Sequence, residues 1–280
     1  MLNDVTFGQF YPTNSALHKL DPRTKILFLI AYITMLFVAN SFYSLALCLV
    51  LLTVGIILSK VPFSSVLRSI KGIIFLLAFT AILNLFFHKG QTPIKIWFIT
   101  IYAEGIIFSI FLMLRLSFLV MASSLLTLTT TPVNLTDGIE SLLTPLKWLR
   151  FPVHALALIM SIALRFIPTL IDETNRIINA QKSRGADFET GGLIKKVKAV
   201  VPILIPLLIS AFRRAEELGD AMDARCYSGS ENRTKYKKLS FGWRDFVALL
   251  LVGALIAGVI LLNIFAFDIC PQIYNYMVIR

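Results

Sequence analysis

The chain has 280 residues, of which 57% are hydrophobic and only 15% are charged, and its mean hydropathy is +0.78. Soluble domains are roughly 45–50% apolar, so this composition excludes an ordinary soluble protein and predicts an integral membrane protein. The net charge of +11 follows the membrane topology described below, so we expect no nucleic-acid partner.

Three cysteines, Cys48, Cys226 and Cys270, are odd in number and share no metal-binding or redox spacing. Neither a disulfide framework nor a metal site is therefore expected. The sequence has no glycine-rich phosphate loop, so we expect no bound cofactor and place any ATP on another chain. The first apolar run begins at Ile26 and no small-residue cleavage site follows it, so no removable signal peptide is expected.

Five apolar runs are long enough to cross a hydrocarbon core of roughly 30 Å, which takes about 20 residues of helix. They cover about 25–40, 42–59, 70–88, 103–127 and 245–267. The sequence therefore predicts an all-α integral membrane protein with about five transmembrane helices.

The distribution of lysine and arginine predicts the orientation, because cytoplasmic loops carry the excess of positive charge. Residues 128–244 contain 17 of the 27 Lys and Arg residues. We expect this segment and the N-terminus to be cytoplasmic, in a multi-pass protein of the cell membrane. The expected parts are 1–131 with four transmembrane helices, 132–244 as a cytoplasmic helical region, and 245–280 with the last transmembrane helix and an external tail.

The central segment has two possible interpretations. Residues 152–171 and 199–212 are apolar enough to form a further hairpin of spans. That hairpin would place the basic loop 172–198 outside and Arg165 within a span, against the charge rule. We favour long amphipathic helices that graze the cytoplasmic leaflet and dip partly among the spans.

Three helices are expected on the cytoplasmic side. Thr131 and Pro132 have the residue types of a helix start, namely an N-cap hydroxyl and a proline in the first turn. The second helix runs from about 153 to 185, with a bend at Pro168, and the third from about 193 to 225. In the third helix, spacings of four and three residues predict a packing seam against another helix or a partner. This seam consists of Ala211, Ala215, Leu218 and Met222.

The second and third helices each end in a small-Arg-small triplet, Ser183-Arg184-Gly185 and Ala224-Arg225-Cys226. One interpretation is C-terminal capping, since a cation in the last turn complements the helix dipole by about 0.3–1 kcal/mol and glycine is the favoured residue after the cap. The other is docking, because an arginine fork binds carboxylates or carbonyls in fixed geometry. Two matched occurrences flanked by small residues favour docking.

Three stretches of the chain resemble the transmembrane T component of energy-coupling factor (ECF) transporters, and the likeness covers nearly the whole length. The stretches are Leu17-His18-Lys19-Leu20-Asp21-Pro22-Arg23-Thr24-Lys25, Leu164-Arg165-Phe166-Ile167-Pro168, and Arg213-Arg214-Ala215-Glu216-Glu217-Leu218 through Ala221-Met222-Asp223-Ala224-Arg225. The resemblance implies a scaffold subunit of an ATP-powered importer of vitamins or other micronutrients.

The resemblance also implies partners. In that family two X-Arg-X triplets, commonly Ala-Arg-Gly, end coupling helices that insert into grooves on two ATP-binding-cassette ATPase subunits, which are identical or different. Carried over, the docking arginines are Arg184 and Arg225; the sequence departs from the common form at Ser183 and Cys226. A substrate-binding S component would pack against the apolar helix faces, and ATP hydrolysis would rock it within the membrane.

Two other functions stay open as alternatives. A membrane-embedded lipid-modifying enzyme would need paired carboxylates, and the only adjacent acids, Asp172-Glu173 and Glu216-Glu217, lie among basic residues at helical spacing. A permease that encloses its own substrate path predicts broken helices and inverted repeats. Arg115, near the centre of the fourth span, is expected to form a structural pair or a partner contact.

Overall fold

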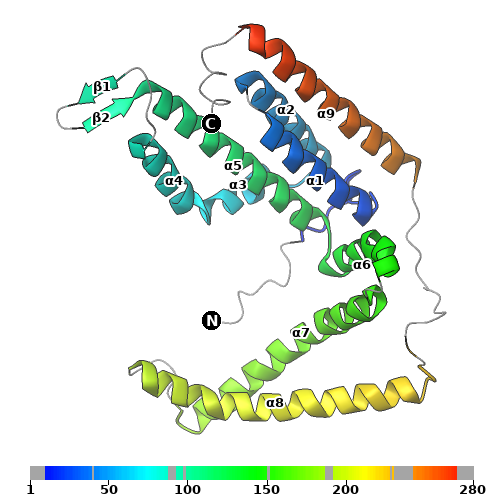
Figure 1. The fold of residues 1–280 in the computed structure, drawn as a ribbon. Helices are drawn as coiled ribbons and strands as arrows, with labels where there is room; N and C mark the ends of the chain where they lie inside the picture. Colours follow the sequence, from blue (N-terminus) through cyan, green and yellow to red (C-terminus); the bar gives the residue numbers. More distant parts are fainter. Residues whose placement is uncertain are drawn as a thin grey trace. The chain divides into compact units, whose positions relative to one another are not determined.

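A computed structural model describes residues 10–39, 41–87, 93–96, 99–149, 152–186, 192–227, 229 and 242–269. The chain is predominantly α-helical, which confirms the predicted fold class of an all-α membrane protein (Figure 1). It splits into two compact units, between residues 139 and 140 and between 238 and 239. We call residues 10–139 with 242–269 the bundle unit, and residues 140–229 the crossed-helix unit. The three expected parts, with boundaries at 131 and 244, stay a prediction.

The bundle unit consists of seven helices, one of them shared with the other unit, and a short hairpin. The helices are α1 (Pro22–Val38), α2 (Phe42–Ser59), α3 (Phe63–Lys71), α4 (Ile74–Phe87), α5 (Ala103–Thr129), α6 (Pro132–Leu143) and α9 (Trp243–Ile269). The strands β1 (Pro93–Ile96) and β2 (Ile99–Tyr102) pair antiparallel, with Ile94 opposite Ile101. The sequence analysis did not anticipate this hairpin.

The crossed-helix unit contains the last residues of α6, a 3-10 helix at Thr144–Leu149, and two long helices, α7 (Val153–Ser183) and α8 (Leu193–Asp223).

Local capping determines several of the helix starts. The Thr131 hydroxyl accepts from the backbone N–H of Asn134 at 3.3 Å, which confirms the predicted start of α6.

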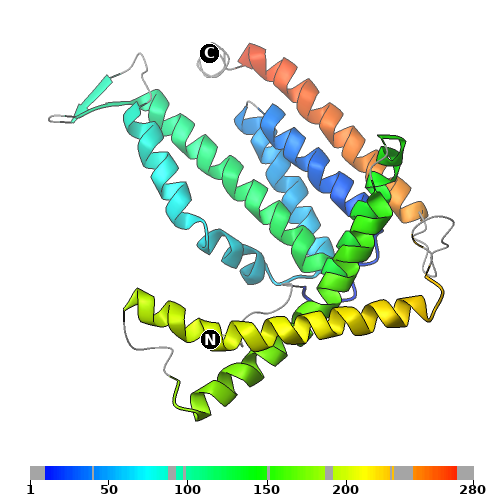
Figure 2. The same cartoon turned by 60° about the horizontal axis from the view of Figure 1, so that its bottom comes forward.

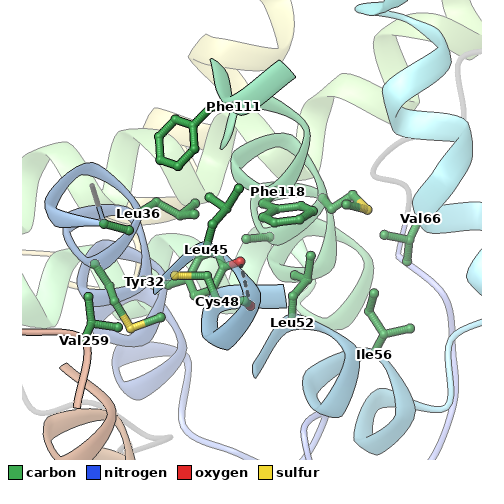
Figure 3. Close-up of a cluster of buried hydrophobic side chains, with 14 of the residues drawn as sticks. Tyr32, Leu36, Leu45, Cys48, Leu52, Ile56, Val66, Phe111, Phe118 and Val259 are labelled. Atoms are coloured by element: carbon green, nitrogen blue, oxygen red, sulfur yellow. Dashed lines mark hydrogen bonds between the residues drawn. The ribbon is translucent and has the colours of Figure 1, made fainter. Parts of the chain in front are cut away.

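The core of the bundle unit lies between α1, α2, α5 and α9 (Figure 3). Leu36, Cys48 and Phe111 are at most 1% exposed, and the Tyr32 hydroxyl donates to the Cys48 carbonyl at 3.2 Å. Val259 of α9 joins this cluster although the sequence separates it from α5 by more than 100 residues. Helices from the first and last parts of the chain therefore contribute to one hydrophobic core.

The number of apolar spans differs from the expected count of about five. Within the described residues, α2, α5 and α7 are long and apolar enough to cross a membrane, and the bent pair α3–α4 makes a fourth if it counts as one span. The other two expected positions are occupied by α1, which has 17 residues with Arg23 and Lys25 in its first turn, and by α9.

Helix α7 meets the criterion for a span, although we expected it to lie at the cytoplasmic leaflet. None of the residues in its apolar window is buried within the chain, whereas a third of each window in α2 and α5 is buried. Whether α7 spans the membrane or lies along its cytoplasmic leaflet, its apolar residues need an apolar environment. The chain itself does not supply that environment.

Arg115 contacts the end of a neighbouring helix. Its Nη2 donates to the carbonyl oxygen of Ala39, the residue that caps α1, and its guanidinium lies 4.7 Å from the ring centroid of Phe111. A helix end leaves carbonyls without intrahelical partners, and within lipid each such group is costly. Arg115 therefore has a structural role inside the bundle, which is one of the two roles expected from the sequence.

A buried ammonium group joins α1 to the end of α5 at one end of the bundle unit. Lys25, in the first turn of α1, is 7% exposed, and its Nζ donates to the carbonyl of Thr129 at 2.9 Å and to the hydroxyl of Thr130 at 3.2 Å. Its third contact is the His18 carbonyl at 3.4 Å. All three donors of the ammonium thus have acceptors, two of which lie at the end of α5.

The carboxylate of Asp245 links the start of α1 to α9. The backbone N–H of Asp21 donates to Oδ1 of Asp245 at 3.0 Å, and the backbone N–H of Gly242 donates to Oδ2 at 2.9 Å. Asp21 itself caps α1 by accepting from the N–H of Arg23 at 2.9 Å. We call Asp21, Lys25, Thr129, Thr130 and Asp245 the polar junction; it connects residues 224 positions apart in the sequence.

The segment before α1 folds over the same end of α5. The backbone N–H of Tyr11 donates to the Leu128 carbonyl at 2.9 Å, while His18 lies 2.7 Å from the Ser15 hydroxyl and 3.0 Å from the Tyr11 carbonyl. Burial lowers the pKa of His18. This segment therefore packs on the end of α5 that forms the polar junction, and its His18 carbonyl contacts Lys25.

We expect Lys25→Met to destabilise the bundle, because it fills the same volume but leaves the Thr129 carbonyl and the Thr130 hydroxyl without a donor. A buried polar group that loses its partner costs about 1–3 kcal/mol. The midpoint of thermal unfolding in detergent measures this loss. Lys19→Met, at an exposed position six residues earlier, is the control. Equal midpoints for the two variants would show that the junction does not hold the bundle together.

Candidate functional site

Helices α7 and α8 have the same length, 31 residues, and pack against each other within the crossed-helix unit. Figures 1 and 2 show from two directions that they cross, with their C-terminal ends on opposite sides of the crossing. Glu173 of α7 and Arg214 of α8 form an ion pair at 3.5 Å. Each helix is about 46 Å long, so the two ends reach well beyond the crossing.

The end of α7 is a Schellman cap, in which the chain turns back through a left-handed residue. Gly185 has a φ of +82°, the backbone N–H of Ala186 donates to the Gln181 carbonyl at 3.0 Å, and the N–H of Gly185 donates to the Lys182 carbonyl at 3.0 Å. Arg184 directly precedes the left-handed residue and is exposed. The Ser183 hydroxyl donates back to the Asn179 carbonyl at 3.1 Å.

The end of α8 has the same hydrogen-bond pattern with a different residue in the left-handed position. Cys226 has a φ of +55°, the N–H of Tyr227 donates to the Met222 carbonyl at 3.0 Å, and the N–H of Cys226 donates to the Asp223 carbonyl at 2.9 Å. Arg225 directly precedes Cys226 and is exposed. A non-glycine residue rarely adopts positive φ, so cysteine at this position costs conformational energy that glycine would not.

The two triplets are therefore equivalent in backbone geometry, and their arginines occupy the same position relative to the left-handed turn. Both guanidinium groups are exposed, and within the described residues neither forms an ion pair or a side-chain hydrogen bond. The helix carbonyls at each end are satisfied by backbone N–H groups, so neither arginine is needed as a cap. Both side chains remain available to a partner.

The predicted seam is only partly directed toward α7. Ala211, Leu218 and Met222 are half-buried, while Ala215 is exposed. Arg214 is half-buried and contacts Glu173, so the side of α8 that packs on α7 includes Arg214 in place of Ala215. The role of this seam as a partner contact stays a prediction, and Ala215 is the member that the chain leaves open.

Other candidate residues do not assemble into a catalytic or metal-binding cluster. No group of three or more His, Cys, Asp or Glu side chains that could hold a metal ion occurs in the part of the chain that the structure describes. Glu216 and Glu217 are both exposed. One pair that the sequence analysis missed is Glu140 and His154, whose Oε1 and Nδ1 lie 2.7 Å apart; their separation of 14 residues across two helices gives no sequence signal.

Removing the glycine from the cap of α7 and introducing a glycine into the cap of α8 should change amide hydrogen exchange in opposite directions. Gly185→Ala should speed amide hydrogen exchange in the last turn of α7 by about fivefold, because a side chain at positive φ costs about 1 kcal/mol. Cys226→Gly should slow exchange at the end of α8, by less, because glycine also loses more entropy on folding. Gly219→Ala, within α8 and in open space, is the control and should slow exchange there. Unchanged exchange in Gly185→Ala would contradict the left-handed cap.

Comparisons with known proteins give a consistent family. The family model described as CbiQ, cobalt transport protein, matches residues 13–236. A protein of Clostridium kluyveri named "Energy-coupling factor transporter transmembrane protein EcfT" is 50% identical over 266 residues, which cover 94% of this chain and 98% of the relative. Proteins of the same name from Bacillus subtilis and Lactococcus lactis subsp. cremoris are 46% and 43% identical, over 91% and 93% of this chain and 98% of each relative.

The match extends along almost the full length of these relatives and includes the polar segment before α1 as well as both long helices of the crossed-helix unit. The resemblance drawn from the residues is thereby confirmed. The chain belongs to the CbiQ family, as a member of the EcfT group of transmembrane proteins of energy-coupling factor transporters.

Proposed function

We propose that this chain is the membrane scaffold that couples two cytoplasmic ATPase subunits to a substrate-binding S component during the uptake of a vitamin or another micronutrient. The observation that carries the proposal is the pair of equivalent helix ends, each presenting an exposed arginine that has no side-chain partner among the described residues. The chain itself would be non-catalytic, with ATP bound and hydrolysed on the partner subunits.

Two separated ends fit two ATPase subunits better than one. The C-terminal ends of α7 and α8 lie on opposite sides of the helix crossing (Figure 2). Arg184 and Arg225 each lie 11 residues, about 16 Å along the helix axis, beyond the contact between Glu173 and Arg214. A partner that docked on both arginines at once would have to reach past the crossing on both sides. Two subunits, each receiving one helix end, need no such span. Ser183, Gly185, Ala224 and Cys226 are small, so the backbone of each end can approach a groove closely.

A partner in the membrane is supported by the exposed apolar surface of α7 and α8. Leu204, Ile205, Leu208, Ile209 and Phe212 of α8 are 53–63% exposed. Apolar strips of this size on a soluble surface would favour aggregation, so we place them against lipid and the S component. Movement of that component would then be transmitted through α8 to the docked end at Arg225.

The proposed orientation follows the charge distribution. The N-terminus and residues 128–244 lie in the cytoplasm of a multi-pass protein of the cell membrane, because this segment holds most of the basic residues. Cytoplasmic Arg184 and Arg225 would then face the compartment that contains ATP.

The docking proposal predicts that Arg184→Ala and Arg225→Ala each weaken association with the ATPase subunits by about 10- to 100-fold, because a hydrogen bond to a charged group contributes about 1.5–3 kcal/mol. The double variant should lose more than either single one. Co-purification of the ATPase subunits and substrate uptake in cells measure the loss, while the unfolding midpoint should not change.

The matched controls are Arg176→Ala on α7 and Arg213→Ala on α8, which remove exposed arginines away from the helix ends. If the double variant Arg184→Ala with Arg225→Ala retains the ATPase subunits at wild-type yield and supports uptake, the arginines do not dock. If the controls weaken association as strongly, the effect comes from overall charge.

The seam predicts a difference between two neighbouring positions of α8. Ala215 and Glu216 are both exposed within the chain, so tryptophan at either position should leave its fold intact. At Ala215, tryptophan should overpack the contact with the S component, by about 1–3 kcal/mol, and reduce co-purification of that component. The same change at Glu216 should be tolerated, and equal losses at both positions would show that the seam is not an interface.

A further inference from the structure

Helix α3 is short, amphipathic and set at an angle to the spans. It covers Phe63–Lys71 and bends by 58° into α4. Figures 1 and 2 show it turning away from α4 toward the C-terminal end of α5. Helix α3 therefore packs on the side of α5 and does not continue α4 in a straight line.

One side of α3 is fixed to α5 and the core. Val66 is 0% exposed, Ile70 packs against the core cluster, and the hydroxyls of Ser69 and Ser124 lie 2.5 Å apart. These contacts hold the helix in one rotation about its axis. The remaining sides are therefore presented in a defined direction.

The exposed surface of α3 divides into an apolar and a basic stripe. At 100° per residue, Phe63 and Leu67 lie next to each other, and Arg68 and Lys71 lie on the adjoining side. Phe63 is 55% and Leu67 49% exposed, and Arg68 and Lys71 are exposed as well. Lys60, exposed at the end of α2, adds a third cation just before the helix.

These cations have no acidic counterpart. No Asp or Glu occurs between residues 22 and 103. Within the described residues, neither Lys60, Arg68 nor Lys71 forms an ion pair. The stripe is therefore an uncompensated positive surface next to exposed apolar side chains.

The depth of α3 along α5 fits the edge of a bilayer. Helix α5 has 27 residues and is about 40 Å long, so its ends extend beyond a hydrocarbon core of roughly 30 Å. Ser124, the contact of α3, lies five residues before the end of α5, about 8 Å along the axis. Amphipathic interfacial helices lie about 5–10 Å into the boundary between headgroups and acyl chains.

We infer that α3, with Lys60, is a binding site for anionic phospholipid headgroups at the membrane surface. Phe63 and Leu67 insert among the acyl chains, and Lys60, Arg68 and Lys71 contact the phosphates. The site needs little ordering on binding, because α5 already fixes the helix. The inference does not depend on the docking of ATPase subunits, so the two can fail separately.

The full-length chain in nanodiscs of phosphatidylcholine with a minority of phosphatidylglycerol provides the test. After extraction with mild detergent, native mass spectrometry gives the ratio of the two lipids that stay bound. We expect phosphatidylglycerol to be enriched over the bulk mixture. Each cation near an anionic surface contributes about 1 kcal/mol, so the double variant Arg68→Gln with Lys71→Gln should lower this preference about 25-fold, a factor of about five for each cation.

The control variant carries Arg176→Gln and Arg213→Gln, which remove two exposed cations of the crossed-helix unit and should retain the enrichment. Unchanged enrichment in the α3 variant would overturn the inference, as would an equal loss in the control.

A second measurement separates lipid from a protein partner on the same surface. The variant Ser64→Cys, with the other cysteines replaced by alanine, carries a nitroxide label between Arg68 and Lys71 on the exposed side of α3. The accessibility of the label to oxygen and to a water-soluble nickel complex reports whether it lies in the headgroup region. We expect this accessibility to stay the same when the ATPase subunits and the S component are added. Shielding of the label by the added subunits would show that a protein covers α3 and would refute the lipid site.

Discussion

The burial of the Lys25 ammonium is the interaction on which the bundle depends. A charged group away from water is tolerated only when all its donors are used and opposite charge is near. Lys25 meets both conditions, through the end of α5 and through Asp21 and Asp245. Asp245 belongs to α9 and accepts from the backbone N–H of Asp21, one turn before Lys25, so the polar junction also brings two distant parts of the chain together. The polar junction and the hydrophobic core join the same three helices α1, α5 and α9, so each favours the register in which the other forms.

The crossed-helix unit is organised by a different constraint, the termination of two long helices. In both, a left-handed residue turns the chain so that backbone N–H groups satisfy the last carbonyls. The preceding arginine is then free of any capping duty. Cys226 adopts a conformation that suits glycine better, so the turn after Arg225 forms at a conformational cost. Equivalent presentation of both arginines is what a scaffold for two similar partners requires.

Helices α7 and α8 expose apolar side chains that no other part of the chain covers within the described residues. The apolar window of α7 is unburied, and α8 carries a strip of exposed Leu, Ile and Phe residues. The bundle unit, by contrast, has a closed core and supplies acceptors for all three donors of the Lys25 ammonium and for Nη2 of Arg115. Internal burial of apolar side chains is thus concentrated in the bundle, and the proposed lipid and subunit contacts would cover the crossed helices.

The sequence by itself determined the membrane class, the approximate positions of the long helices, the start of α6 at Thr131 and Pro132, the two arginine triplets and the family. Each of these depends on composition, local spacing or residues close together in the chain. The separate helix α3 was not predicted. Other features needed the tertiary structure. Lys25 meets Thr129, and Asp21 meets Asp245, across more than 100 residues. Arg214, instead of Ala215, faces α7 because the crossing of two helices decides which side is covered. The left-handed cap at Cys226 and the contact of Arg115 with Ala39 were likewise decided by backbone geometry and packing, which residue type does not encode.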